Sequence, residues 1–97
     1  MTVTAERFED VSEPDDPHPF EYRGTVYRFA DGDRALLARA YDDEPGAVSF
    51  LRWADGLFPS VPRHPLFRDA VAHARRELGA TEIRVLLPSG YVRLDAG

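Results

Sequence analysis

Residues 64–87, HPLFRDAVAHARRELGATEIRVLL, predict a helix that is followed by a strand. Pro65 suits a first helical turn, and apolar residues recur after it at the three- and four-residue spacing of one helix face: Phe67, Ala70, Val71, Ala74 and Leu78. Gly79 ends the helix, because glycine adopts the left-handed conformation without a Cβ clash. Apolar residues then alternate with Glu82 and Arg84, which is the period of a strand with one buried side. We therefore expect a helix packed on a sheet.

The length and composition place the chain in a broad class. Its 97 residues suffice for one domain with a single core and are too few for two. No apolar run approaches the length of a membrane span, and the first residues lack the basic and apolar regions of a signal peptide, so we expect a cytoplasmic protein that does not bind membranes. The chain has no cysteine, which excludes disulfides, zinc–thiolate sites and thiol nucleophiles.

The side-chain inventory limits the chemistry further. All 12 basic residues are arginine, and the chain has no lysine, asparagine or glutamine. A GC-rich bacterial genome explains this usage, because such a genome favours arginine codons. Schiff-base lysines and carboxamide oxyanion holes are therefore excluded.

The net charge of −5 belongs to the N-terminal segment. Residues 1–18 hold six acids and one arginine, whereas residues 19–97 hold 11 acids and 11 arginines. We predict a mostly disordered, acidic, proline-rich leader over residues 1–19 and a single α+β domain over residues 20–97. The leader is a solvated tail or, alternatively, an acidic arm that covers an arginine patch. The neutral remainder argues against nucleic-acid binding, which needs clustered positive charge.

Residues 20–41 predict two strands. The aromatic residues of 20–29 change phase at Gly24, which indicates a bulge there or, alternatively, a tight turn between two short strands. An Asp-Gly pair at residues 31–32 is typical of a hairpin turn. Residues 34–41 should form the returning strand, although their composition also favours a helix, and the sequence leaves both possibilities open.

Residues 42–56 predict a second helix, with Asp43 as its cap, Pro45 in its first turn and Gly56 at its end. A turn at residues 88–90 leads into a last strand over residues 91–94. The predicted fold is α+β: an antiparallel sheet of about four strands with two helices packed on one face, in the order ββααββ.

We find no constellation that carries catalysis. The three histidines lack the spacing of a zinc motif, no serine lies in a nucleophile elbow, and no glycine-rich loop cradles a phosphate. The acids of residues 42–44 have a structural role at the predicted helix start. We therefore expect no catalytic residue, no metal and no cofactor.

The surface favours binding. Large aromatic residues near element ends, the apolar loop over residues 57–61 and an arginine stripe on the long helix are typical of interfaces. The candidate binding residues are Tyr41, Trp53, Phe58, Arg68, Arg75, Arg76 and Tyr91. The first hypothesis is a small non-enzymatic interaction or regulatory module, for example an inhibitor or immunity-type protein, that binds a protein partner or itself as a homodimer.

The alternative hypothesis is a small-molecule-binding or minor enzymatic domain. It places a pocket between the helices and the sheet, with Arg39 or His73 as the polar contact. The pocket would be lined by Tyr22, Tyr27, Tyr41 and Trp53.

Overall fold

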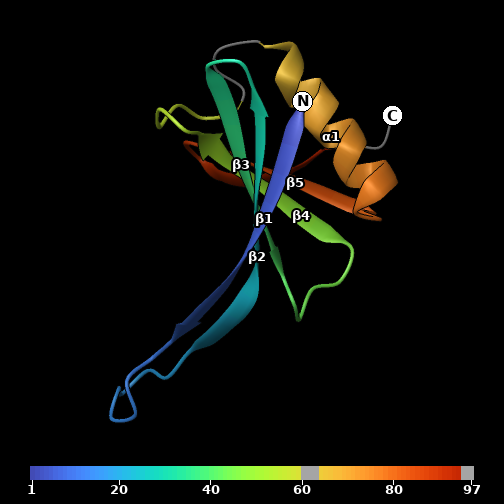
Figure 1. Ribbon diagram of the computed structural model, residues 1–97. Helices are drawn as coiled ribbons and strands as arrows, with labels where there is room; N and C mark the ends of the chain where they lie inside the picture. Colours follow the sequence, from blue (N-terminus) through green and yellow to red (C-terminus); the bar gives the residue numbers. More distant parts are fainter. Residues whose placement is uncertain (60–63, 95–97) are drawn as a thin grey trace.

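The computed structural model describes residues 1–59 and 64–94, which form six strands and one helix. The elements are β1 (Thr2–Val11), β2 (Glu21–Asp31), β3 (Arg34–Tyr41), β4 (Ala47–Trp53), α1 (Pro65–Glu77), β5 (Glu82–Leu87) and β6 (Gly90–Leu94). All six strands lie in one sheet in chain order. Neighbouring strands are antiparallel except β4 and β5, which are parallel because α1 lies in the crossover between them. Figure 1 shows α1 lying over one face of this mixed sheet.

The predicted four-stranded antiparallel sheet with two helices is therefore wrong. The described residues hold a single helix and a six-stranded mixed sheet. Other parts of the prediction are confirmed. The helix occupies Pro65–Glu77, Gly79 follows it with a φ of 68°, β5 comes next, and residues 34–41 are a strand rather than a helix.

The predicted second helix is strand β4. Gly46 has a φ of 85°, so the chain turns there instead of continuing a helix from Pro45. In β4, Arg52 pairs with Leu37 but Phe50 pairs with Ala38, so Leu51 is the extra residue of a β-bulge. The bulge puts Phe50 and Trp53 on the same face although they are three residues apart, which is a helical spacing.

The predicted disordered leader contains strand β1 instead, which pairs with β2 along its whole length. Strand β3 pairs with β2 only from Gly24 onward, so residues 9–23 form a two-stranded ribbon and its loop. We call these residues the arm. Figure 1 shows the arm projecting from the rest of the sheet, and the molecule measures 45 × 27 × 27 Å.

Gly24 lies where the arm joins the body of the sheet. The register on both sides of Gly24 is continuous, so neither the predicted bulge nor the predicted turn is present. The glycine is buried. A Cβ atom at this position would overlap the carbonyl oxygen of Ala40 and lie 2.8 Å from the Phe8 ring, so only glycine fits. The rings of Phe8 and Tyr41 therefore meet beside a residue without a side chain, with their centroids 5.7 Å apart.

The core lies between α1 and one face of the sheet, which we call the covered face. Its largest fully buried side chains come from five elements: Phe29, Leu36, Phe50, Trp53, Leu66 and Ile83. Ala70 and Ala74 of α1 are also buried, and such small residues let the helix approach the strands closely. The helix begins at His64, whose Nδ1 accepts a hydrogen bond from the Leu66 amide at 3.1 Å. No helix in the described part of the chain is long and apolar enough to cross a membrane.

Candidate functional site: the open face of the sheet

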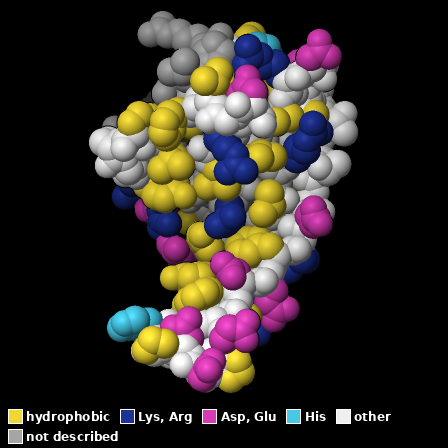
Figure 2. Space-filling model, turned by 90° about the vertical axis from the view of Figure 1, so that its left-hand side faces the viewer, with side chains coloured by type: hydrophobic (Ala, Val, Ile, Leu, Met, Phe, Trp, Pro, Cys, Tyr) yellow, Lys and Arg dark blue, Asp and Glu magenta, His cyan; other side chains and the backbone are white. Residues whose placement is uncertain are grey.

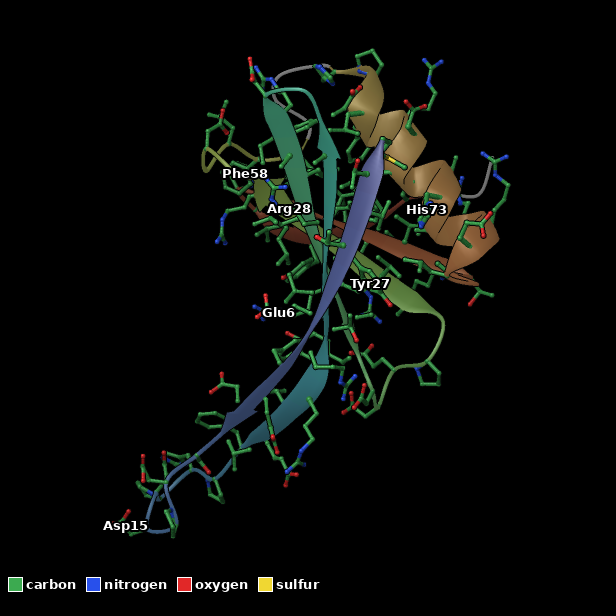
Figure 3. The ribbon with its side chains drawn as sticks, in the orientation of Figure 1. Glu6, Asp15, Tyr27, Arg28, Phe58 and His73 are labelled. Atoms are coloured by element: carbon green, nitrogen blue, oxygen red, sulfur yellow. The ribbon has the colours of Figure 1, made fainter. Side chains whose placement is uncertain are left out.

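Within residues 1–59 and 64–94, the face of the sheet opposite α1 has no helix over it, and we call it the open face. In Figure 3, Glu6 and Arg28 lie on this side, whereas His73 lies on the side of the helix. Directly paired residues of neighbouring strands point to the same face, so the registers identify the members of the open face. They include Phe8, Tyr22, Arg28, Leu37, Arg39, Tyr41, Ser49, Arg52, Arg84 and Tyr91. Figure 2 shows this face with arginines among apolar side chains.

A groove of about 550 Å³ crosses one half of the open face. Its lining includes Tyr22, Tyr41 and Tyr91, with the buried Ser49 also contributing. Arg84 lies between two carboxylates and donates from its terminal nitrogen to Glu44 at 2.5 Å and from Nε to Glu82 at 2.7 Å. These aromatic and paired charged groups provide both apolar contact and hydrogen-bonding sites.

The ion pair fixes the charge state of the groove. The hydrogen bond from Arg84 lowers the pKa of Glu44, and that carboxylate in turn raises the pKa of the Arg84 guanidinium. Both groups are therefore fully charged near neutral pH. A general acid or base needs a pKa near the operating pH, so this pair is suited to recognition rather than to proton transfer.

A cluster of aromatic rings and one arginine lies where the arm meets the body. The guanidinium of Arg39 lies 4.8 Å from the centre of the Phe8 ring and 5.9 Å from that of Tyr41, in cation–π geometry. It donates to the Tyr41 hydroxyl at 3.2 Å. The rings continue along the arm, because Tyr22 lies 5.9 Å from Tyr41 and 5.7 Å from Phe20. We call Phe8, Phe20, Tyr22 and Tyr41 the aromatic row.

The arginines of the open face differ in their partners. The buried Nε of Arg39 has no hydrogen-bond acceptor within the described ranges. Arg28 and Arg52 flank Leu37 in the sheet and form no ion pair with any residue that the structure describes. These three residues, Arg28, Arg39 and Arg52, are the arginine patch.

The arm carries the opposite charge. Its acids are Glu9, Asp10, Glu13, Asp15, Asp16 and Glu21. Glu9 and Glu21 both pair with Arg23 at the base of the arm. Asp10, Glu13 and Asp15 are exposed and have no ion pair in residues 1–59 and 64–94. The lower end of the face in Figure 2 is accordingly rich in acids.

The structure divides the predicted binding residues among four places. Tyr41 and Tyr91 both line the groove. Trp53 is instead 1% exposed in the core, where its indole nitrogen donates to the Pro59 carbonyl at 3.2 Å, and Phe58 is exposed beyond the end of β4. The arginine stripe on α1 lies on the opposite side of the sheet: Arg68, Arg75 and Arg76. The predicted apolar loop over residues 57–61 lies partly outside the described residues.

The residues of the alternative pocket are also separated. Tyr22, Arg39 and Tyr41 belong to the open face. Trp53 and Tyr27 lie on the covered side, where His73 packs edge-on against the Phe29 ring at 5.7 Å. Among the described residues the set is therefore divided, because strand alternation sends its members to both faces: Tyr22, Arg39 and Tyr41 line a cavity on the open face that Tyr27, Trp53 and His73 do not line.

Sequence reasoning missed Phe8 and three arginines of the open face: Arg28, Arg52 and Arg84. The alternation of polar or aromatic residues with apolar ones along a strand is the sequence signal that indicates this face. In residues 35–41, Leu37, Arg39 and Tyr41 alternate with Leu36, Ala38 and Ala40, which separates a polar-aromatic face from an apolar one once a strand is assumed.

Within residues 1–59 and 64–94, no group of three or more histidines and acids is placed to hold a metal ion. Comparisons of the chain with models of protein families, with curated proteins and with solved structures find no match.

Proposed function

We propose that the protein is a non-enzymatic interaction module that binds a protein partner through the open face of its sheet. One observation carries this proposal: a six-stranded sheet has its only described helix on one face, while the other face presents aromatic and arginine side chains. Aromatic residues and arginine dominate the energetics of protein interfaces. An exposed face of this kind in a small domain is typical of an interaction site.

The exposure of individual side chains supports a protein as the ligand. Tyr91 is 54% exposed and Tyr22 is 49% exposed, and they contribute to the same groove. Large rings that are only half covered can each bury more area in a complex at little cost in side-chain entropy. Residues of five strands, β2 to β6, line the groove, which fits an extended protein surface.

The groove also favours a second candidate, a small-molecule site. Its volume of about 550 Å³ falls within the usual range of ligand pockets. Its charged groups are already paired with one another, however, as in the Glu44–Arg84–Glu82 arrangement. A small ligand would have to compete with these pairs for its polar contacts, and we therefore place the protein partner first.

Site-specific photo-crosslinking tests the proposal. A photoreactive phenylalanine analogue is placed at Tyr91 on the open face and, as the matched control, at Arg76 on the exposed side of α1. After irradiation in cells of the source organism, we expect crosslinked proteins from position 91 and few or none from position 76. Mass spectrometry of the crosslinked bands identifies the partner. Absence of crosslinks from position 91, or equal crosslinking from both positions, contradicts an open-face protein interface.

A further inference from the structure

We propose that the partner of the open face is a second copy of this chain, in a two-fold dimer where the arm of each copy lies across the arginine patch of the other. The inference rests on the proposed function and names its partner. Three features carry it: the distribution of charge along the face, the uncovered apolar side chains of the arm, and an arginine without an anion.

The charge of the open face is polarised along its length. The arm end carries Asp10, Glu13 and Asp15 without ion pairs, and the body carries the arginine patch, whose three arginines outnumber Glu6, the acid beside Arg28. When two copies of such a surface meet face to face and antiparallel, each acidic end lies over a basic end, so both contacts are favourable. The parallel arrangement places like charges together. A surface that is acidic at one end and basic at the other is therefore complementary to itself.

The arm has no element packed over it from the part of its own chain that the structure describes. A two-stranded ribbon is at best marginally stable when nothing packs against it. Strand β3 ends its pairing at Gly24, and the helix lies over the body, so the described elements give the arm neither a third strand nor a helix. Phe20 is 38% exposed and Tyr22, which stacks on it, is 49% exposed on this ribbon. Contact with the body of a second copy would bury these side chains and support the arm.

Arg39 supplies the third feature. A guanidinium that is partly removed from water requires an acceptor for its N–H groups, and a carboxylate is the strongest one available. The buried Nε of Arg39 has no acceptor among the described residues, although the aromatic row holds the guanidinium in place. An aspartate or glutamate from the arm of the second copy would supply an anion to this part-buried guanidinium at its terminal nitrogens, since the Nε atom itself is buried. Arg28 and Arg52 would receive the remaining acids of that arm.

The oligomeric state in solution is the first test. Size-exclusion chromatography with light scattering is applied to the full chain at several protein concentrations. We expect twice the mass of one chain at low salt. The dimer should dissociate at about 1 M salt, where charges are screened beyond about 3 Å. A chain that stays monomeric at low salt and high protein concentration overturns the inference.

Charge reversal provides the specific test. The arm variant carries Asp10→Arg, Glu13→Arg and Asp15→Arg, and the face variant carries Arg28→Glu and Arg52→Glu. These residues form no ion pair within the described ranges, so the fold of each monomer should survive. Each variant measured separately has arm and face of like charge, and we expect it to lose the dimer. An equimolar mixture restores opposite charges at both contacts, and we expect a heterodimer.

The outcomes separate this inference from the proposed function. Variants that still form homodimers, or a mixture that stays monomeric, overturn the arm exchange. Formation of the mixed dimer also shows that both variants are folded. If the chain is monomeric but position 91 crosslinks to a different protein, the proposed function stands and the dimer fails. If the chain is monomeric and position 91 gives no crosslink, both fail.

Discussion

The two faces of the sheet differ although the same strands build them. Leu36 and Leu37 are chemically identical neighbours in β3, yet Leu36 is completely buried on the covered face and Leu37 is only half-buried on the open face. The difference comes from α1, which lies over one face alone. On the covered face the sheet is stabilised by apolar packing, whereas on the open face arginines and aromatic rings remain available for contacts. For these two leucines, burial is therefore decided by what covers the residue and not by its type.

The largest expected effect comes from truncating the covered face. Phe50 is completely buried against the rings of Phe29 and Phe67, whose centroids lie 5.8 and 5.7 Å away. We expect Phe50→Ala to lower the free energy of unfolding by about 3–5 kcal/mol, because it removes apolar contacts and leaves a cavity. The matched variant Leu37→Ala on the open face should cost about 1 kcal/mol or less. Urea unfolding followed by circular dichroism measures both.

Protein concentration matters for this comparison, since association would cover the open face. Unfolding is therefore measured at the lowest concentration that the signal allows. Equal losses for Phe50→Ala and Leu37→Ala would show that the two faces do not differ in packing as the structure describes.

A smaller loss of stability is expected from a substitution at Gly24, which lies under the Phe8 and Tyr41 rings of the open face and outside the core. A methyl group at this position overlaps the carbonyl of Ala40 and presses on the Phe8 ring. We expect Gly24→Ala to cost about 1–3 kcal/mol, because the strands must shift to accept the methyl group. Two-dimensional NMR should show changed signals for Phe8 and Tyr41 and an unchanged indole signal from Trp53, the only tryptophan.

The neighbouring substitution Thr25→Ala is the control for Gly24→Ala, since it adds no atoms to β2. A Gly24→Ala protein that is as stable as the original, with unchanged aromatic signals, would disprove the close approach of Phe8 and Tyr41 over this glycine.

The helix and the strand after it could be predicted because their signals are local. Pro65 in the first turn, the one-sided apolar pattern and Gly79 all lie within the helix or directly after it. Strand β4 could not be predicted from the same kind of signal, because its bulge at Leu51 puts Phe50 and Trp53 on one face at a helical spacing. The acids and Pro45 before it also resemble a helix start. Gly46 was the contrary signal, since a left-handed residue stops a helix.

The arm was mispredicted for a different reason. Its acids and prolines indicate disorder when the segment is considered alone. The hydrogen bonds of β1 come from β2, which lies about twenty residues further along the chain, and composition does not report such pairing. The open face was only partly predictable for the same reason. Tyr41 and Tyr91 were expected to bind, but their relation to Arg39 and Arg84 follows from strand registers.

The smallest expected effect concerns acid, and it sharpens the contrast between the apolar covered face and the charged open face. Arg84 holds the pKa of Glu44 below its ordinary value of 4.5 through a hydrogen bond. A carboxyl whose pKa is lower in the folded than in the unfolded state stabilises the fold above the unfolded value, and this stability is lost as the pH falls through the folded pKa. The Glu44 side chain is 42% exposed, so solvent screens the pair and the contribution is small.

We therefore expect Glu44→Gln to lower the thermal midpoint slightly at neutral pH and to have no effect at the acidic end of the range, below both pKa values. The measurement is the difference in midpoint between the two proteins as the pH is lowered from 7. The matched control is Glu77→Gln on α1, which forms no ion pair within the described residues and should give a difference without this pH dependence. Only an ionised Glu44 gains stability from the Arg84 guanidinium. A difference for Glu44→Gln that stays constant to the lowest pH would therefore contradict a stabilising Arg84–Glu44 ion pair.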